Sequence, residues 1–347
     1  MIDREDYIYK TNFGKAFCGD SLKLIPQLED NSIDLVMTSP PFALLRQKEY
    51  GNKDQTEYVE WLAKFGELIY PKLKETGSLV IDLGGAYQKG APVRSLYNFR
   101  VLIHFCDKLG YHLAEEFYWF NPSKLPSPIE WVNKRKIRAK DSVNTVWWFS
   151  KTEFPKSDVT KVLAPYSDRM KKLIENPDKY YKAKKRPSGH DIGNSFGNDN
   201  GGSIPSNLLQ ISNSESNSKY MSLAKEIGIN THPARFPIKL PEFFINLLTN
   251  DGDIVLDIFA GSNTTGEAAE MLGRRWLAFE NDINYLSASI LRFLPKEIKK
   301  ENLLKYYNSI LNCEQVNIET QINLFNQSFI VAEEEIEYAK NSASESF

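Results

Sequence analysis

Cysteine and histidine are scarce in this sequence. Its 347 residues include only three cysteines, Cys18, Cys106 and Cys313, and four histidines. The cysteines are widely spaced and odd in number, which excludes a disulfide framework, and no cysteine or histidine cluster has the spacing of a zinc site. We therefore expect inert thiols in a reducing compartment and no bound metal.

Long apolar runs are also absent, because no run exceeds what a buried strand or helix requires. The first ten residues, MIDREDYIYK, contain acidic side chains and lack the apolar core of a signal peptide. Hydrophobic residues still make up 41% of the chain, which is sufficient for a globular core. Together these features predict a soluble protein of the cytoplasm without a membrane span.

The net charge is small, at −2, but the charges are unevenly distributed. Residues 124–186 contain 17 Lys or Arg against 7 Asp or Glu, an excess of ten positive charges, so the rest of the chain carries twelve net negative charges. A basic segment in an acidic protein is typical of a surface that binds a polyanion such as nucleic acid. A solvated lysine-rich face explains the same charges, and charge alone leaves both interpretations open.

Strand and helix patterns alternate along two parts of the chain. Within residues 12–149, AFCGD, IDLVMTSP, GSLVIDLG and EEFYWF are typical of strands, and EYVEWLAKFGELIYPKL and SLYNFRVLIHFCDKLG have helical spacing. After His232 follow the helix LPEFFINLLTN, the strand DIVLDIFA, the helix EAAEMLGR and the strand RWLAFEND. This alternation predicts an α/β fold with a mostly parallel sheet, in which GSLVIDLG lies beside the strand that ends in TSPPF.

The region between these two parts has a different composition. It is first lysine-rich and then rich in Gly, Asn and Ser, as in GHDIGNSFGNDNGGSIPSN. A loop this long inside a compact protein is usually functional or disordered. We therefore divide the chain into one half of a domain at residues 1–150, a loop-rich insert at 151–230, the second half of the same domain at 231–294, and an acidic, partly helical tail at 295–347.

The segment DIFAGSNTTGEAAEMLGRRWLAFEND carries the clearest chemical signal. A strand runs into a Gly-containing turn that opens a helix, and the next strand ends in Glu280. In an α/β sheet this places a ligand at the carboxyl end of the strand, where small residues allow close approach and the acid binds ribose hydroxyls. Neither G-x-G-x-x-G nor G-x-x-x-x-G-K-[ST] is present. The pattern predicts a nucleoside site, with a purely structural turn as the alternative.

A second unusual segment is TSPPF, Thr38 to Phe42, at the end of the strand SIDLVM. Two prolines are awkward there, because neither donates to a sheet and each fixes its own backbone angle. A proline-kinked strand end would explain the pattern structurally. Its pairing with the nucleoside motif favours a functional interpretation.

DIFAGSNTTG resembles the S-adenosylmethionine motif of DNA amino-methyltransferases, and TSPPF resembles their catalytic motif S-P-P-[YF]. The catalytic motif comes first and the cofactor motif second, with the basic segment between them, which is the order in the β group of these enzymes. The resemblance covers most of residues 12–294 and includes KEYGN, YWFNPSKLPSP and HPARFPIKLPEFF. It implies a Rossmann-like, S-adenosylmethionine-dependent methyltransferase fold in permuted order, with helices on both faces of the sheet and a target-recognition insert.

The same resemblance implies S-adenosyl-L-methionine as cofactor, with Asp20 and Phe259 near its adenine. Asn263 replaces a glycine of the more common loop G-S-G-T-T-G, but asparagine tolerates left-handed backbone angles, so we expect the loop to keep its shape. HPARFP is expected near the methionine carboxylate, with His232 as a loop residue. The expected cofactor-binding residues are Asp20, Thr38, Asp257, Phe259, Gly261, Ser262, Asn263, Thr264, Thr265, Gly266 and Glu280.

The expected substrate explains the composition of TSPPF. An exocyclic amino group is a poor nucleophile because its lone pair is delocalised into the base, so catalysis requires acceptors that hold its N–H bonds. Ser39 supplies one acceptor and the Pro40 carbonyl another, stiffened by Pro41, while Phe42 offers a ring face to a base lifted out of the duplex. Asp82, which ends the strand in GSLVIDLG, is expected to orient Ser39 or assist proton loss, with a helix cap as the alternative.

Serine at position 39 resembles the subgroup that methylates N4 of cytosine, whereas adenine-specific members usually carry Asp or Asn there. We therefore predict a site-specific, cytosine-N4-specific DNA methyltransferase of a type II restriction-modification system. N6-adenine methylation on the same scaffold is the nearest alternative. A non-catalytic DNA-binding sensor of S-adenosylmethionine is an alternative of another class, and RNA is an alternative substrate.

The resemblance also implies double-stranded DNA with a short palindromic site and a paired restriction endonuclease. We expect a monomer, with a dimer as the alternative. Trp119, Asn121 and Pro122 resemble the family's wall beside the flipped base, and residues 151–230 are expected to contact base edges. The basic residues expected to contact DNA are Lys134, Arg135, Lys136, Arg138, Arg169, Lys184, Lys185 and Arg186.

Overall fold

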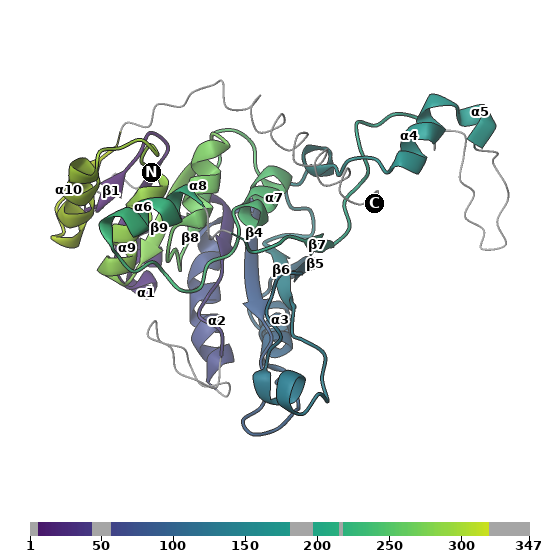
Figure 1. The fold of residues 1–347 in the computed structure, drawn as a ribbon, viewed down its shortest axis with the longest axis horizontal. Coiled ribbons are helices and arrows are strands. Elements are labelled where there is room, and N and C mark those ends of the chain that lie inside the picture. The colour runs from purple at the N-terminus through teal and green to yellow at the C-terminus, as the bar shows by residue number, and fades with distance from the viewer. Residues whose placement is uncertain (1–5, 44–56, 181–196, 215–217, 319–347) are drawn as a thin grey trace.

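Ten strands join into one sheet in the computed structural model, which describes residues 6–43, 57–180, 197–214 and 218–318. In chain order they are β1 (Tyr9–Lys10), β2 (Gly14–Cys18), β3 (Ile33–Thr38), β4 (Leu73–Gly84), β5 (His112–Phe120), β6 (Val143–Ser150), β7 (Leu208–Gln210), β8 (Ile254–Asp257), β9 (Arg275–Glu280) and β10 (Val316–Asn317). In space the order is β10-β1-β2-β9-β8-β3-β4-β6-β5-β7 (Figure 1).

The centre of this sheet is parallel, from β2 through β9, β8 and β3 to β4. All six residues of β3 are buried, as is typical of a strand covered on both faces. Because parallel strands end at the same edge, the chain segments that follow β3 and β8 emerge side by side. The predicted sheet is thus confirmed, and the strand in GSLVIDLG lies beside the strand that leads to TSPPF.

Helices cover both faces of the sheet. They are α1 (Ser21–Leu24), α2 (Tyr58–Ile69), α3 (Tyr97–Asp107), α4 (Asp168–Glu175), α5 (Pro177–Tyr180), α6 (Lys219–Ile227), α7 (Lys239–Leu248), α8 (Thr264–Met271), α9 (Ile283–Ser289) and α10 (Lys300–Leu311). One core contains Leu62 of α2 and Phe105 of α3, and the other contains Phe244 of α7 and Ala268 of α8. Every helix in the described residues is too short or too polar to cross a bilayer.

One long strand, β6, was not identified from the sequence. It lies between β4 and β5 and runs antiparallel to both. The run VNTVWWFS is buried from its second residue to its last, but the connection before it contains just a short π-helix, Glu130–Lys134, so the alternation of strands with longer helices did not reveal it. Since β5 runs parallel to β4, the connection between β5 and β6, residues 121–142, starts at the edge where TSPPF lies (Figure 1).

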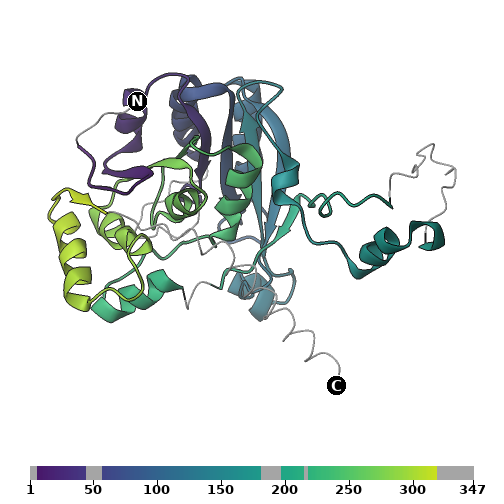
Figure 2. The same cartoon turned by 90° about the horizontal axis from the view of Figure 1, so that it is seen from above.

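The region predicted as a loop-rich insert contains regular structure. Helices α4 and α5 lie away from the sheet in both views (Figures 1 and 2), whereas β7 extends the sheet beside β5. Helix α6 begins at an N-cap, Ser218, ends at Gly228 in the left-handed conformation (φ +71°), and packs against α10 and the turn Ile290–Arg292. Near the carboxyl terminus, β10 pairs with β1, and residues 319–347 of the expected tail lie outside the described residues.

A charged cluster ties the starts of several strands together at the opposite edge of the sheet. Buried Asp34 of β3 accepts hydrogen bonds from Lys74 Nζ of β4 (2.8 Å), Lys156 Nζ (3.1 Å) and the N–H of Ile254 in β8 (3.0 Å). Lys156 also donates to Asp253 (2.6 Å). Burial alone would raise the pKa of Asp34, but these hydrogen bonds hold it below its ordinary value. The cluster therefore joins both halves of the domain to the start of the insert.

Replacing Asp34 with Ala should lower the free energy of unfolding by about 2–3 kcal/mol, less than for a fully buried pair because both lysines are partly exposed. Urea titration at pH 7 measures this loss. A carboxyl whose pKa is lowered by folding stabilises above about pH 4 and loses that contribution as pH falls, so the difference from wild type should shrink in acid. The control is Asp30→Ala, since Asp30 pairs with Lys72 but is 70% exposed, and it should cost under about 0.5 kcal/mol. Equal losses from both variants would contradict the role of Asp34.

Candidate active site

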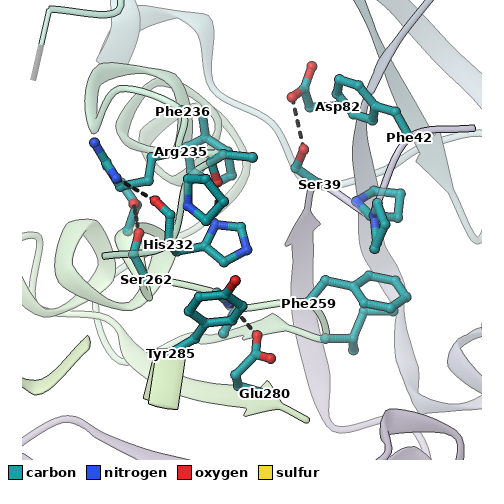
Figure 3. Close-up of a pocket in the computed structure, with 18 of the residues that line it drawn as sticks. Ser39, Phe42, Asp82, His232, Arg235, Phe236, Phe259, Ser262, Glu280 and Tyr285 are labelled. Atoms are coloured by element: carbon teal, nitrogen blue, oxygen red, sulfur yellow. Dashed lines mark hydrogen bonds between the residues drawn. The ribbon is translucent and has the colours of Figure 1, made fainter. Parts of the chain in front are cut away.

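A cavity of about 900 Å³ lies at the carboxyl ends of the central strands. This volume is near the upper end of the range for small-molecule pockets. Figure 3 shows Ser39 and Asp82 at one end of the cavity and Phe259 and Glu280 at the other. The expected site residues that line it are Asp20, Ser39, Pro40, Pro41, Phe42, Asp82, Trp119, Asn121, Phe259, Gly261, Ser262, Thr264 and Glu280.

The catalytic end is built around a buried carboxylate. Ser39 Oγ donates to Asp82 Oδ2 over 3.0 Å (Figure 3), and Asn144 Nδ2 of β6 donates to Asp82 Oδ1 over 3.0 Å. Asp82 is 1% exposed. Burial raises its pKa to about 6, against the hydrogen bonds from Asn144 and Ser39 and the weaker attraction of Lys124. Asp82 thus accepts from two side chains and does not cap a helix.

Aromatic side chains form walls at this end. The position of the Phe42 ring requires a glycine at residue 84, because a Cβ at Gly84 would lie 2.4 Å from that ring. Trp119 is 6% exposed, and its Nε1 donates to the Ile211 carbonyl over 2.8 Å, which fixes the indole. Flat, fixed rings of this kind suit a planar base.

The two motifs are joined behind the cavity wall by Asp257, which is buried. Its carboxylate accepts from Thr38 Oγ1 (2.7 Å), Thr265 Oγ1 (2.7 Å) and the N–H of Phe259 (3.0 Å). Burial raises the pKa of Asp257 despite these three bonds. Asp257, Thr38 and Thr265 therefore hold the site together and do not line the cavity.

Glu280 is fixed at the cofactor end. Its carboxylate accepts from the N–H of Gly261 (2.6 Å) and the N–H of Asp282 (2.9 Å). Burial raises its pKa against these backbone bonds. Gly261 has φ +52°, and a Cβ there would lie 3.3 Å from the ring of His232. A larger residue would therefore narrow the cavity between Gly261 and His232. A fixed acid beside a glycine suits recognition of ribose hydroxyls.

Asn263 lies in the left-handed conformation (φ +56°), as its residue type allows, and caps helix α8. Its Oδ1 accepts from the N–H of Gly266 (3.1 Å), and its Nδ2 donates to the Tyr9 hydroxyl (2.8 Å). A Cβ at Gly266 would lie only 2.3 Å from Asn263 Oδ1. Asn263 and Gly266 therefore lie beneath the loop and shape it, and neither lines the cavity.

Several lining residues were not identified from the sequence as site residues. Trp61 and Phe65 of α2 pack on Phe259, with ring centroids 5.7 Å and 4.9 Å apart, and form an aromatic wall at the cofactor end. The amphipathic pattern of α2 predicted a helix but gave no sign that two of its rings face a cavity. Their role depends on tertiary packing.

A polar bridge spans the other side of the cavity. Asn121 Oδ1 accepts from the N–H of Asn213, over 3.3 Å, and Asn213 Nδ2 donates to the Arg235 carbonyl over 2.8 Å. The segment HPARFP, which the sequence placed near the cofactor without one assigned residue, lines the cavity from His232 to Phe236. His232 packs edge-on against Tyr285, with ring centroids 4.5 Å apart.

The remaining expected residues that the structure describes lie outside the cavity. Pro122, Lys134, Arg135, Lys136 and Arg138 belong to the connection between β5 and β6, and Arg169 lies on α4. Lys184, Lys185, Arg186 and the segment KEYGN lie outside the described residues. Within the described part of the chain, no group of three His, Cys, Asp or Glu side chains is arranged to hold a metal ion.

Comparison with known proteins agrees with this geometry. Residues 33–291 match a family model described as DNA methylase. The chain belongs to the DNA methylase family. Type II methyltransferase M.PvuII of Proteus hauseri is 64% identical to this DNA methylase over 314 residues, which cover 90% of this chain and 94% of that protein. Type II methyltransferase M.BamHI of Bacillus amyloliquefaciens is 28% identical over 79% of this chain and 56% of that protein.

A solved structure described as PvuII DNA methyltransferase (cytosine-N4-specific) superposes on this DNA methylase with a TM-score of 0.75. It is 54% identical in sequence and covers 90% of this chain and 97% of that chain. S-adenosylmethionine fits the residues at the cofactor end. Phe259, Trp61 and Phe65 provide apolar ring surface, Glu280 provides a fixed acceptor, and Gly261 leaves room for close approach.

Replacing Gly266 with Ala should weaken binding of S-adenosylhomocysteine at least about tenfold, because the new methyl group collides with the Asn263 side chain and so displaces the loop backbone at Asn263. Asn263→Gly alone should stay within about threefold of wild type, since glycine accepts the same left-handed angle. The double variant should recover most of the lost affinity, because the three atoms nearest the added Cβ all belong to Asn263. Isothermal titration calorimetry measures all three. A double variant as weak as Gly266→Ala would show that the clash is not the cause.

Proposed function

We propose that this DNA methylase is a site-specific enzyme that transfers a methyl group from S-adenosylmethionine to the N4 amino group of cytosine in duplex DNA. The observation that carries the proposal is the bonded pair Ser39 and Asp82 at one end of a cavity whose other end is the cofactor loop. The strong similarity to a type II methyltransferase and to a structure described as cytosine-N4-specific supports the same activity.

Ser39 is arranged to accept a hydrogen bond from the target amino group. Its own proton is donated to Asp82, so the lone pairs of Oγ remain available to an N–H of the base. The Pro40 carbonyl, held by the proline pair, supplies a second acceptor. Two acceptors that hold the N–H bonds favour a more tetrahedral nitrogen, whose lone pair is then free to attack. S-adenosylmethionine supplies the activated methyl group.

Asp82 is suited to take up the proton that the amino nitrogen must lose after methylation. A pKa of about 6 leaves its carboxylate mostly ionised at neutral pH, yet closer to the operating pH than an ordinary aspartate. The path runs from the nitrogen to Ser39 Oγ while the hydroxyl proton passes to Asp82 Oδ2. Asn144 holds the other carboxylate oxygen, so Asp82 keeps its orientation throughout.

The connection between β5 and β6 forms a basic platform beside the cavity, and we propose that it contacts the DNA backbone. Ion pairs and hydrogen bonds brace it, including Arg94 to Asp141 (2.7 Å) and Arg138 Nε to the Pro92 carbonyl (3.1 Å). Lys134 and Arg135 pair with Glu130 at 3.3 Å and 3.0 Å, and both are exposed. Exposed pairs are weak, so phosphate can replace Glu130 at little cost.

We propose that base-specific contacts come from residues 151–230, which include Arg169 on the projecting helix α4. The relatives described as type II methyltransferases support a short, palindromic recognition site and functional pairing with a restriction endonuclease. Such an enzyme acts on the DNA in the cytoplasm of a prokaryotic host. We propose a monomer, with a dimer as the alternative that analytical ultracentrifugation distinguishes.

Incubating the protein with duplex DNA of mixed sequence and methyl-labelled S-adenosylmethionine should yield labelled N4-methylcytosine. Digestion to nucleosides and mass spectrometry identify the product. Ser39→Ala should bind S-adenosylhomocysteine normally but lower turnover at least about a hundredfold, because one acceptor for the amino group is lost. Labelled N6-methyladenine would overturn the base assignment. No label despite cofactor binding would favour an RNA substrate or a non-catalytic sensor.

The raised pKa of Asp82 predicts opposite pH effects on activity and stability. Activity should rise through a midpoint near pH 6, because only the ionised carboxylate can take up the proton that passes through Ser39. A carboxyl whose pKa is raised by folding stabilises most when protonated, so its contribution is full below about pH 4 and is lost as pH rises to about 6. Asp82→Asn should remove both dependences and lower turnover strongly. Activity profiles and urea titrations from pH 4.5 to 8 measure them, and an unchanged acidic limb in Asp82→Asn would contradict this assignment.

A further inference from the structure

Arg292 is a buried cation that neither sequence motif explains. It ends the turn Ile290–Arg292 and is 3% exposed. Its Nε donates to the carbonyl of Ser262 (2.6 Å), its Nη2 to Ser262 Oγ (3.0 Å), and its Nη1 to Glu267 Oε2 (2.6 Å). One guanidinium therefore holds both the backbone and the side chain of a cofactor-loop residue, and Glu267 balances its charge.

The held residue lies directly at the cavity. Ser262 lines it, and Ser262 Oγ lies 3.2 Å from Thr264 Oγ1, whose residue lines it as well. Two bonds from one planar group fix the Ser262 peptide and hydroxyl in a single orientation. Because Arg292 itself does not line the cavity, it acts on a bound ligand only through this loop.

Arg292 also contacts the helix that follows the insert. The guanidinium carbon of Arg292 lies over the Tyr220 ring of α6, 4.4 Å from the centroid of that ring. Tyr220 is 1% exposed. Lys219, at the start of α6, donates from Nζ to the Arg292 carbonyl over 2.6 Å. The same residue thus contacts the cofactor loop on one side and α6 on the other.

We propose that Arg292 is a positioning residue for the cofactor, which sets the shape of the loop at Ser262 and depends on α6, through Tyr220, for its own orientation. The proposal rests on the proposed function, because the ligand of the loop is taken to be S-adenosylmethionine. Arg292 acts on affinity for that ligand and has no part in the attack by the amino nitrogen, since the Ser39 end of the cavity is built from other elements.

The same half of the domain contains a matched control. Arg274 is also a buried arginine, 6% exposed, and it donates to Thr249 Oγ1 (3.1 Å) and Asp251 Oδ1 (2.7 Å). None of its hydrogen bonds reaches the cofactor loop. A purely structural arginine should behave as Arg274 does, whereas a positioning arginine should change ligand binding as well.

The test compares Arg292→Lys with Arg274→Lys. Lysine keeps the charge but replaces the planar, forked guanidinium with one ammonium nitrogen, so it loses the paired geometry toward the Ser262 carbonyl and hydroxyl. Calorimetry should show Arg292→Lys binding S-adenosylhomocysteine about tenfold or more weakly, with a raised KM for S-adenosylmethionine and kcat at saturation within about twofold of wild type. Arg274→Lys should lower the urea midpoint to a similar degree yet bind within about twofold of wild type. Anisotropy with labelled duplex DNA should be unchanged in both.

Two further variants keep the proposal testable if Arg292→Lys does not fold. Tyr220→Leu removes the ring under the guanidinium, and Ser262→Ala removes one of the two acceptors on the loop, so each should weaken S-adenosylhomocysteine about threefold to fivefold. Wild-type affinity for S-adenosylhomocysteine in Arg292→Lys, or in both Tyr220→Leu and Ser262→Ala, would overturn the proposal. So would a loss of affinity in Arg274→Lys as large as that in Arg292→Lys. Wild-type protein that binds no S-adenosylhomocysteine would instead overturn the proposed cofactor itself.

Discussion

The carboxylate of Asp257 is the interaction on which the site depends. It bonds the last residue of β3, Thr38, and a residue of α8, Thr265, and so fixes the start of the catalytic segment relative to the cofactor loop. A methyl transfer requires donor and acceptor to be aligned within a fraction of an ångström. A rigid link between the catalytic segment and the cofactor loop therefore contributes to that alignment more than the rigidity of either segment alone. Burial of Asp257 strengthens the link, because water does not compete for its oxygens.

The link is possible because β3 and β8 are neighbours in a parallel sheet although more than two hundred residues separate them. Chain order has no influence on such a contact, since only the direction and adjacency of the strands place their carboxyl ends together. This explains how the motif order can be permuted while the site stays intact. The cluster around Asp34 lies at the opposite edge of the sheet, where Lys156 donates to Asp34 of β3 and to Asp253, the residue before β8. The same pair of strands is therefore held at both ends.

The sequence predicted the parts of the molecule whose signals are local. Buried runs such as β3 and β8 were predicted because composition and spacing suffice for them, and Ser39 and Gly261 were expected in the site because their motifs resemble those of a methyltransferase family. The partners Asn144 and Trp61 were not, because each comes from an element whose contact with the cavity is decided by packing. Helix α6 shows a different limit. Its cap signals, Ser218 and Gly228, were present in the sequence, but the surrounding Ser- and Asn-rich composition favoured a loop.

Three carboxylates at one edge of the sheet, those of buried Asp82 and Asp257 and of partly buried Glu280, have raised pKa values, yet only Asp82 is suited to chemistry. Asp257 accepts three hydrogen bonds, and Glu280 is held by backbone N–H groups, so both are committed to acceptance and are fixed in place. Asp82 accepts from Asn144 and from the hydroxyl of Ser39, and Ser39 lines the cavity, so its hydroxyl can pass a proton from a ligand to Asp82. The Thr38 and Thr265 hydroxyls that donate to Asp257 do not line the cavity, and a backbone N–H cannot relay a proton. Two of these acids are therefore structural and one can exchange a proton, because only Asp82 accepts from a hydroxyl that also lines the cavity.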